Sequence, residues 1–306
     1  MQSGKTQPAK WNAAEYAANS AVQQSWAREL IDRLHLQGDE RVLDVGCGDG
    51  KVTAEIARAV RLGSVLGVDA SPEMIAFAKT TFPPKKYPSL KFQVCDARQI
   101  IEARLSPPSP RRGEGRGEEA NSKPLTSTLS PLERGEGENL ARFDVLFSNA
   151  ALHWVDDHEA ILRGAAAVLK SGGRLAISCG GRGNAHDVFL ALRPEMRLNR
   201  WREFFRRMPM PYFFYAPGDY ERWLPGFGFK IRTLKLAPRD ATYAGAEGFA
   251  TWLRTTWLPF VQRVPEGLRE EFIAAVTRRY LARHPLDRAG NVLVRMVRLE
   301  IEAVKI

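Results

Sequence analysis

The segment with the clearest chemical potential is a glycine-rich loop, Asp-Val-Gly-Cys-Gly-Asp-Gly, at residues 44–50. An apolar run predicts a strand over residues 41–47, and a helical pattern begins at Lys51. Glycines at a strand-to-helix turn let the backbone approach a ligand closely. We therefore expect Gly46, Cys47 and Gly48 to contact a nucleotide-like cofactor.

The charges around this loop separate two classes of cofactor. Dinucleotide-binding loops carry Gly-x-Gly-x-x-Gly, and Lys51 stands where their third glycine falls. Asp44 lies two residues before the first glycine, where a carboxylate repels a pyrophosphate but attracts an ammonium or a sulfonium. The sequence therefore predicts S-adenosyl-L-methionine as the cofactor rather than NAD.

Two further acids end predicted strands and fit the same ligand. Asp69, followed by Ala70, can accept hydrogen bonds from both ribose hydroxyls; alternatively it supports the helix cap expected at Ser71. Asp96, followed by Ala97, can accept the adenine amino proton; alternatively it is a solvated turn residue.

The methionine part and the adenine face have candidates of their own. Asn149 ends the fourth predicted strand and is expected to face the methionine part of the cofactor. Met74 is expected to cover the adenine, although a methionine at helical spacing can equally belong to the core. The three cysteines show no metal-ligand spacing, so no metal is expected and the thiols are interpreted as reduced and buried.

Short apolar strands alternate with helices around these residues, which is typical of a parallel sheet covered on both faces. We predict a Rossmann-like α/β fold with a seven-stranded, mostly parallel sheet, helices on both faces and a helical cap. The predicted strands cover residues 41–47, 65–69, 90–95, 143–148, 174–178, 230–236 and 292–301. The predicted helices cover residues 11–37, 51–61, 72–78, 158–169, 246–262 and 266–283.

The chain is expected to divide into a helical lid at residues 1–37 and a catalytic domain at 38–104 and 140–306. Within that domain, residues 185–225 and 242–285 are predicted to form the cap; the aromatics at 204–223 either exclude water from the substrate or form the core of the C-terminal helices. Residues 105–139 carry five Pro, five Gly and repeated Leu-Ser-Pro and Arg-Gly-Glu-Gly motifs. We interpret them as a disordered insertion, or alternatively a binding loop.

Three segments resemble a known family: residues 44–53 (DVGCGDGKVT), 68–78 (VDASPEMIAFA) and 143–156 (FDVLFSNAALHWVD). They are similar to class I S-adenosylmethionine-dependent methyltransferases, most of all the trans-aconitate and juvenile hormone acid methyltransferases. The resemblance covers residues 11–180 apart from the insertion, and the C-terminal region more loosely. It implies O-methylation of the carboxylate of a small organic acid.

The resemblance also implies acceptor-binding residues. In the juvenile hormone type, a glutamine after a Tyr-x-x-x-Ser segment and a tryptophan in Leu-His-Trp hold the substrate carboxylate. The matching residues here are Gln23 and Trp154, with Gln24 leaving the register open by one. An ionised carboxylate needs no general base. His153 is the candidate base for the alternative, O- or C-methylation of a hydrophobic small molecule.

The bulk composition bears on partners and location. The formal charge is +10, and residues 193–239 hold 11 Lys and Arg against 4 Asp and Glu. This surface could attract nucleic acid, but Ser148-Asn149-Ala150-Ala151 replaces the Asn-Pro-Pro-aromatic motif of nucleic-acid amino methyltransferases, so nucleic acid is not the expected partner. No segment predicts a signal peptide or a membrane span. We expect a cytoplasmic monomer or homodimer acting on a small carboxylic acid.

Overall fold

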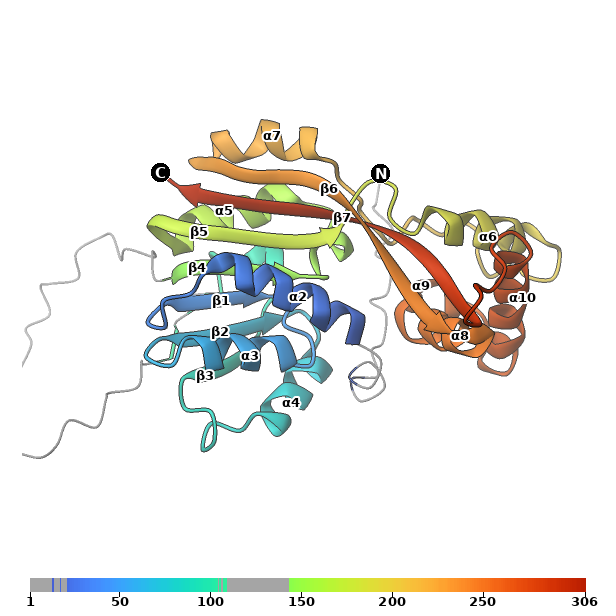
Figure 1. The fold of residues 1–306 in the computed structure, drawn as a ribbon, viewed down its shortest axis with the longest axis horizontal. Coiled ribbons are helices and arrows are strands. Elements are labelled where there is room, and N and C mark those ends of the chain that lie inside the picture. Colours follow the sequence, from blue (N-terminus) through green and yellow to red (C-terminus); the bar gives the residue numbers. More distant parts are fainter. Residues whose placement is uncertain (1–12, 14–16, 18–20, 104, 106, 109–142) are drawn as a thin grey trace, which may run out of the picture.

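The computed structural model describes residues 21–103 and 143–306, together with positions 13, 17, 105, 107 and 108. Residues 1–12, 14–16 and 18–20 of the predicted N-terminal lid lie outside the described residues, and so does the predicted insertion apart from positions 105, 107 and 108. The start of the helix predicted over 11–37 is described only at positions 13 and 17. Within the described part, a seven-stranded sheet forms the centre of the molecule (Figure 1), as predicted.

The strands follow the order β3-β2-β1-β4-β5-β7-β6. The first five in this order are parallel, and β7 is antiparallel to both of its neighbours. Because β1 and β4 connect to opposite sides of the sheet, their carboxyl ends form the point where such folds bind ligands. The strands are β1 (Arg41–Val45), β2 (Ser64–Asp69), β3 (Leu90–Val94), β4 (Phe143–Asn149), β5 (Leu169–Gly180), β6 (Phe229–Ala244) and β7 (Asn291–Lys305).

Alternate strand residues face opposite layers of helices. Val42, Val65 and Val145 pack with the helices α2 (Ala21–Leu34), α3 (Lys51–Ala59) and α4 (Pro72–Thr81). Their neighbours in sequence, such as Leu43, pack against α5 (His158–Val168) and α7 (Pro217–Gly226) on the other face. The strands are therefore buried from both sides, which accounts for their nearly continuous apolar sequences.

The helix α4 begins as its sequence predicts. The Ser71 hydroxyl accepts the backbone N–H of Met74 over 3.2 Å, and Pro72 occupies the first helical position. This cap satisfies an amide group that the first turn of a helix otherwise leaves unpaired. It also fixes where the chain turns after Asp69.

Beyond the sheet, the long ribbon of β6 and β7 leads into a helical lobe (Figure 1). The lobe has its own apolar core, which includes Phe249, Phe272 and Tyr280. Its elements are α6 (His186–Arg197), α8 (Gly245–Thr256), α9 (Leu258–Val261), η3 (Glu266–Leu268) and α10 (Arg269–Leu281). Trp201, Phe205 and Tyr212, from the segment that follows α6, are buried in the same core.

The segment predicted as the first part of the cap, residues 185–225, packs in two different cores. Residues 217–226 form α7, whose Tyr220 and Leu224 are buried in the sheet's core rather than in the lobe. The Tyr220 hydroxyl lies 2.5 Å from Nδ1 of His158 on α5. The aromatic segment therefore divides between two cores, and its end belongs to the sheet.

Candidate functional site

A large cleft of about 1810 Å³ opens at the carboxyl ends of the parallel strands. Every residue predicted to bind the cofactor lines it. They are Asp44, Gly46, Cys47, Gly48, Asp69, Ala70, Met74, Asp96, Ala97 and Asn149. The fold thus brings together residues that lie up to about a hundred positions apart in the sequence.

The glycine loop is shaped by close backbone packing. Gly46 adopts a φ of 78°, and a Cβ added there would lie 2.1 Å from the Cβ of Ala151. The carboxylate of Asp69 accepts the backbone N–H of Gly48 over 3.0 Å and that of Ser71 over 2.9 Å. Asp69 therefore holds the loop and the start of α4 on the two sides of the cleft.

The substitution Gly46→Ala should destabilise the fold by about 1–3 kcal/mol, because it combines a left-handed backbone with a steric overlap. The measurement is the thermal unfolding midpoint. Gly218→Ala is the matched control, since no heavy atom lies within 4 Å of its Cβ position. Equal melting of the Gly46→Ala variant and the wild type would contradict this account of the loop.

Asp44 is the most deeply placed acid of the cleft, with 2% of its surface exposed. Its carboxylate accepts the Thr53 hydroxyl over 2.7 Å. The pKa of Asp44 is raised to about 7: burial raises it most, the Thr53 hydrogen bond opposes this, and the nearby charge of Asp69 adds to the rise. Burial also raises the pKa of Asp69. A cation placed in this part of the cleft would favour the charged forms of both carboxylates.

Asp96 has protein partners as well as a place in the cleft. Its carboxylate accepts the Arg98 backbone N–H over 2.9 Å and pairs with the Arg98 guanidinium at 2.7 Å. Hydrogen bonding from Arg98 lowers the pKa of Asp96. Arg98 also reaches Asp156 at 3.0 Å. Arg98 and Asp156 line the cleft too, and the sequence reasoning did not identify them.

The predicted acceptor residues meet at one edge of the cleft. Gln23 and Trp154 line both the cleft and a smaller cavity of about 60 Å³ beside it. The Oε1 atom of Gln23 is buried and makes no hydrogen bond within the part of the chain that the structure describes. An unsatisfied buried amide is costly, so a polar ligand group is the natural partner for it.

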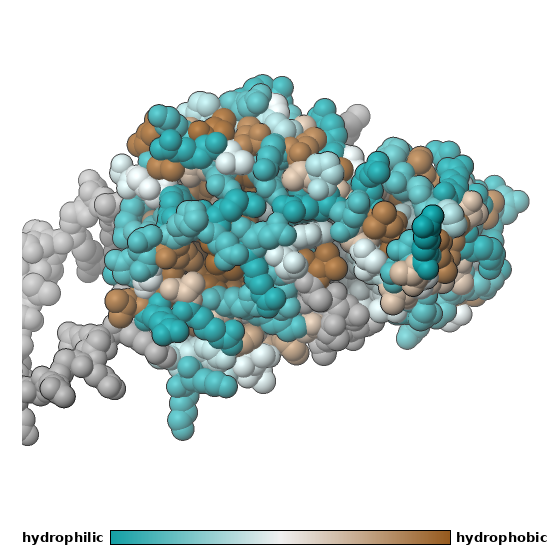
Figure 2. Space-filling model, viewed as in Figure 1, coloured by the Kyte–Doolittle hydropathy of each residue, from teal (hydrophilic) through white to brown (hydrophobic). Residues whose placement is uncertain are grey.

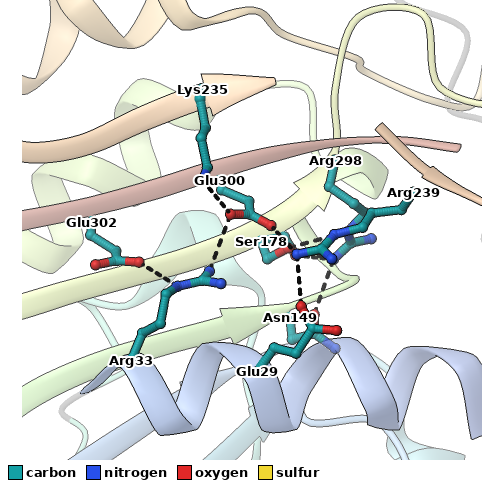
Figure 3. Close-up of polar contacts among 9 residues, drawn as sticks. All are labelled: Glu29, Arg33, Asn149, Ser178, Lys235, Arg239, Arg298, Glu300 and Glu302. Atoms are coloured by element: carbon teal, nitrogen blue, oxygen red, sulfur yellow. Dashed lines mark hydrogen bonds and ion pairs between the residues drawn. The ribbon is translucent and has the colours of Figure 1, made fainter. Parts of the chain in front are cut away.

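Asn149 connects this edge to the sheet. Its Nδ2 donates to the backbone carbonyl of Gln23 over 3.0 Å. Its Oδ1 accepts from Arg298 over 3.0 Å (Figure 3). The two bonds fix the side chain of Asn149 at the end of β4. They also tie the start of α2 to the strand that borders the cleft.

His153 faces the smaller cavity and does not line the cleft. The backbone N–H of Gly180 donates to its Nδ1 over 3.3 Å, so a neutral ring carries its proton on Nε2. Burial, and the charge of Arg298 after it, lower the pKa of His153 to about 3. This environment makes His153 a hydrogen-bond donor and a poor proton acceptor, which disfavours the base considered for hydroxyl acceptors.

The positive charge of residues 193–239 is partly paired within the protein. Arg239 lies 2.7 Å from Glu29 and 3.3 Å from Glu300, and Arg222 lies 2.7 Å from Asp219. On the face shown in Figure 2, hydrophilic side chains dominate and hydrophobic ones form separate small patches. The described residues contain no helix long and apolar enough to cross a membrane. They also contain no cluster of three metal-binding side chains.

Sequence comparison connects these features with known proteins. A family described as "Methyltransferase domain" matches residues 18–234. An uncharacterized methyltransferase of Schizosaccharomyces pombe is 27% identical over 84% of each chain. The trans-aconitate 2-methyltransferase of Variovorax paradoxus is 26% identical, over 96% of this chain and 98% of its own.

Structure comparison finds the same fold. The phosphoethanolamine N-methyltransferase 2 of Haemonchus contortus, solved in complex with S-adenosyl-L-methionine, superposes with a TM-score of 0.53 at 16% identity. The match covers 96% of this chain and 56% of that one. At this identity the likeness concerns the fold alone.

Proposed function

We propose that this chain, which belongs to the methyltransferase family, uses S-adenosyl-L-methionine to O-methylate the carboxylate of a small organic acid. The observation that carries the acceptor is the side-chain amide of Gln23 at the junction of the cleft and the smaller cavity. Its buried Oε1 has no hydrogen-bond partner among the described residues, and rotation of the amide would put the Nε2 donor in that place. The cofactor is supported by the acids and the glycine loop of the cleft.

The cleft fits the cofactor group by group. Asp44 supplies the carboxylate for an ammonium group, and Asp69 lies at the end of β2, where ribose hydroxyls bind in folds of this kind. Gly46 lets the loop pack closely against Ala151, where a side chain on residue 46 would overlap. Asp96, Ala97 and Met74 line the same cleft. In the proposed arrangement the first two border the adenine and Met74 covers its face. A fold neighbour solved with this cofactor agrees with the assignment.

The acceptor side needs only binding and orientation. S-adenosyl-L-methionine, when bound, supplies an electrophilic methyl group on a sulfonium. The amide of Gln23 can rotate to donate to a carboxylate, and Trp154 lies beside it. A carboxylate is already ionised at pH 7 and needs no base, so the low basicity of His153 is no obstacle. Alignment of this kind can supply roughly 7–11 kcal/mol of the barrier.

A relative of known name supports the acid class. The Variovorax paradoxus protein, which matches nearly the whole chain, is a trans-aconitate 2-methyltransferase. We carry over to this chain only the reaction class that this name states, the methylation of an organic acid. Trans-aconitate is therefore a natural member of any panel of acceptors.

The proposed role of Asp44 predicts a pH dependence of cofactor binding. Below a pKa of about 7 the unliganded protein holds a proton on Asp44, and this proton must leave before an ammonium can pair with the carboxylate. Binding should therefore be about tenfold weaker at pH 6 than at pH 8. Titration calorimetry measures it. An Asp44→Asn variant should bind weakly at both values, and a wild-type affinity independent of pH would contradict the role.

The proposed function is tested by turnover of matched acceptors. The protein and S-adenosyl-L-methionine are incubated with carboxylic acids, including trans-aconitate, and with the corresponding alcohols and amides. Release of S-adenosylhomocysteine should depend on acids alone. The proposal would be overturned if only alcohols or amides were methylated, or if none of the acids in the panel were methylated.

A further inference from the structure

The smaller cavity beside the cleft has an unusual lining. Its walls are mainly aromatic, and it shares Gln23, Ala150 and Trp154 with the cleft. Its volume of about 60 Å³ leaves room for several water-sized groups. The aromatic side chains that line it are Trp26, Trp154, Tyr212, Phe214, Trp252 and Trp257.

A charged side chain, Arg298 of β7, also lines this cavity with only 3% of its surface exposed. Its guanidinium donates to Oδ1 of Asn149 and to the Ser178 hydroxyl, both over 3.0 Å (Figure 3). It lies over the ring of Trp26, 4.9 Å from the centroid. A buried arginine held by several contacts presents a positive charge in a fixed place.

His153 stands next to Arg298 through the sheet. Gly180 pairs with Arg298 across β5 and β7, and the N–H of Gly180 is the donor to Nδ1 of His153. The other ring nitrogen, Nε2, carries the proton of the neutral ring. A neutral N–H donor thus accompanies the guanidinium at the same wall.

Apolar walls strengthen the electrostatic effect of both groups. Aromatic side chains exclude water, and a charge acts more strongly where water is excluded. A positive charge and an N–H donor in such a place favour a carboxylate over a neutral or cationic group. Both groups border the smaller cavity and neither borders the cleft, so they act on a part of the ligand away from the cofactor.

Resting on the proposed carboxylate methylation, we propose that Arg298 and His153 hold a second anionic group of the acceptor in this cavity. The carboxylate to be methylated then lies at Gln23 and Trp154, where the cavity meets the cleft. Arg298 and His153 are specificity-determining residues in this arrangement. The acceptor is an acid with two negative groups a short carbon chain apart.

The test compares the binding of succinate and butyrate, which have four carbons but two carboxylates or one. Tryptophan fluorescence reports binding, because four tryptophans line the cavity. The full chain is titrated with and without S-adenosylhomocysteine. The wild type should prefer succinate by about tenfold or more, in keeping with a hydrogen bond to a charged partner. Arg298→Gln should abolish this preference.

Arg295→Gln is the matched control. Arg295 lies on the same strand, exposed, and its substitution removes the same charge; the succinate preference should persist in this variant. If the Arg298→Gln variant melts far below the wild type, the His153→Phe variant is used instead. Its preference for succinate over butyrate should be reduced severalfold. A wild type without preference, or Arg298→Gln and His153→Phe variants that both keep it, would overturn the inference.

The readout separates this inference from the proposed function. Binding of succinate at Arg298 without methylation of any acid would sustain the anion subsite and reject the proposed reaction. If acids are methylated but the variants keep the succinate preference, the proposed reaction stands and the anion subsite is rejected.

Discussion

Replacing Asp69 with asparagine should weaken the binding of S-adenosyl-L-methionine by about a hundredfold. Two ribose hydroxyls would lose a charged acceptor, and a hydrogen bond to a charged group contributes about 1.5–3 kcal/mol. The Asp69 carboxylate accepts the backbone N–H groups of Gly48 and Ser71. An asparagine amide can accept only one of them, because its NH₂ group would face the other. The measurement is titration calorimetry with the cofactor.

Asp39→Asn is the control for this loss, because Asp39 is exposed and lies at the opposite end of β1 from the cleft. Its cofactor affinity should match that of the wild type. The melting temperatures of both variants show whether the folded state persists. An Asp69→Asn protein that binds the cofactor as tightly as the wild type would remove Asp69 from the site.

Replacing Gln23 with alanine should lower kcat/KM for the acid by about ten- to a hundredfold while cofactor affinity remains within a factor of two or so. The amide is expected to donate to the acceptor carboxylate, and one such charge-assisted hydrogen bond accounts for a loss of this size. Steady-state rates with the best acid of the panel measure the effect. Cofactor titration of the same variant supplies the second readout.

Two comparisons sharpen this prediction. Gln37→Ala removes an exposed glutamine whose side-chain amide donates to the backbone carbonyl of His35, and it should leave kcat/KM unchanged. Gln24→Ala tests the register of the acceptor motif, since Gln24 lines the cleft but not the smaller cavity. A large loss at Gln24 with none at Gln23 would move the acceptor site and contradict the assignment.

The meeting of the expected cofactor-binding residues in one cleft could be predicted from the sequence because its signals are local. Asp44, Asp69, Asp96 and Asn149 each stand at the end of a short apolar strand. Parallel strands end at one edge of a sheet, so recognising the strands was enough to bring these residues together. The cap at Ser71 was equally local, since the residue types at the start of a helix define it.

The C-terminal strands were harder to predict because their patterns are long-range. The sequence indicated a strand over 230–236, whereas β6 runs from Phe229 to Ala244 and contains Pro238. A proline is tolerated there because β6 is the edge strand of the sheet. Pairing with β7 along its whole length stabilises the part of β6 that its own sequence does not predict.

Arg298 and Arg98 were missed for a related reason. Arg298 continues the alternation of buried residues at 292, 294 and 296 on β7, and a charge at an inward position is the signal that could have identified it. Its neighbours Ser178 and Asn149 come from other strands, so the sequence could not supply the contacts. Arg98 becomes recognisable only when its partners Asp96 and Asp156 are brought together.

The most direct test of the account is to locate the transferred methyl group in the product. The protein is incubated with S-adenosyl-L-methionine labelled in its methyl group and with the acid that supports turnover, and the product is analysed by mass spectrometry before and after mild alkali. Transfer to a carboxylate gives a labelled methyl ester, which alkali hydrolyses to labelled methanol and the original acid. A label that survives alkali, in an ether or on carbon, would contradict transfer to a carboxylate.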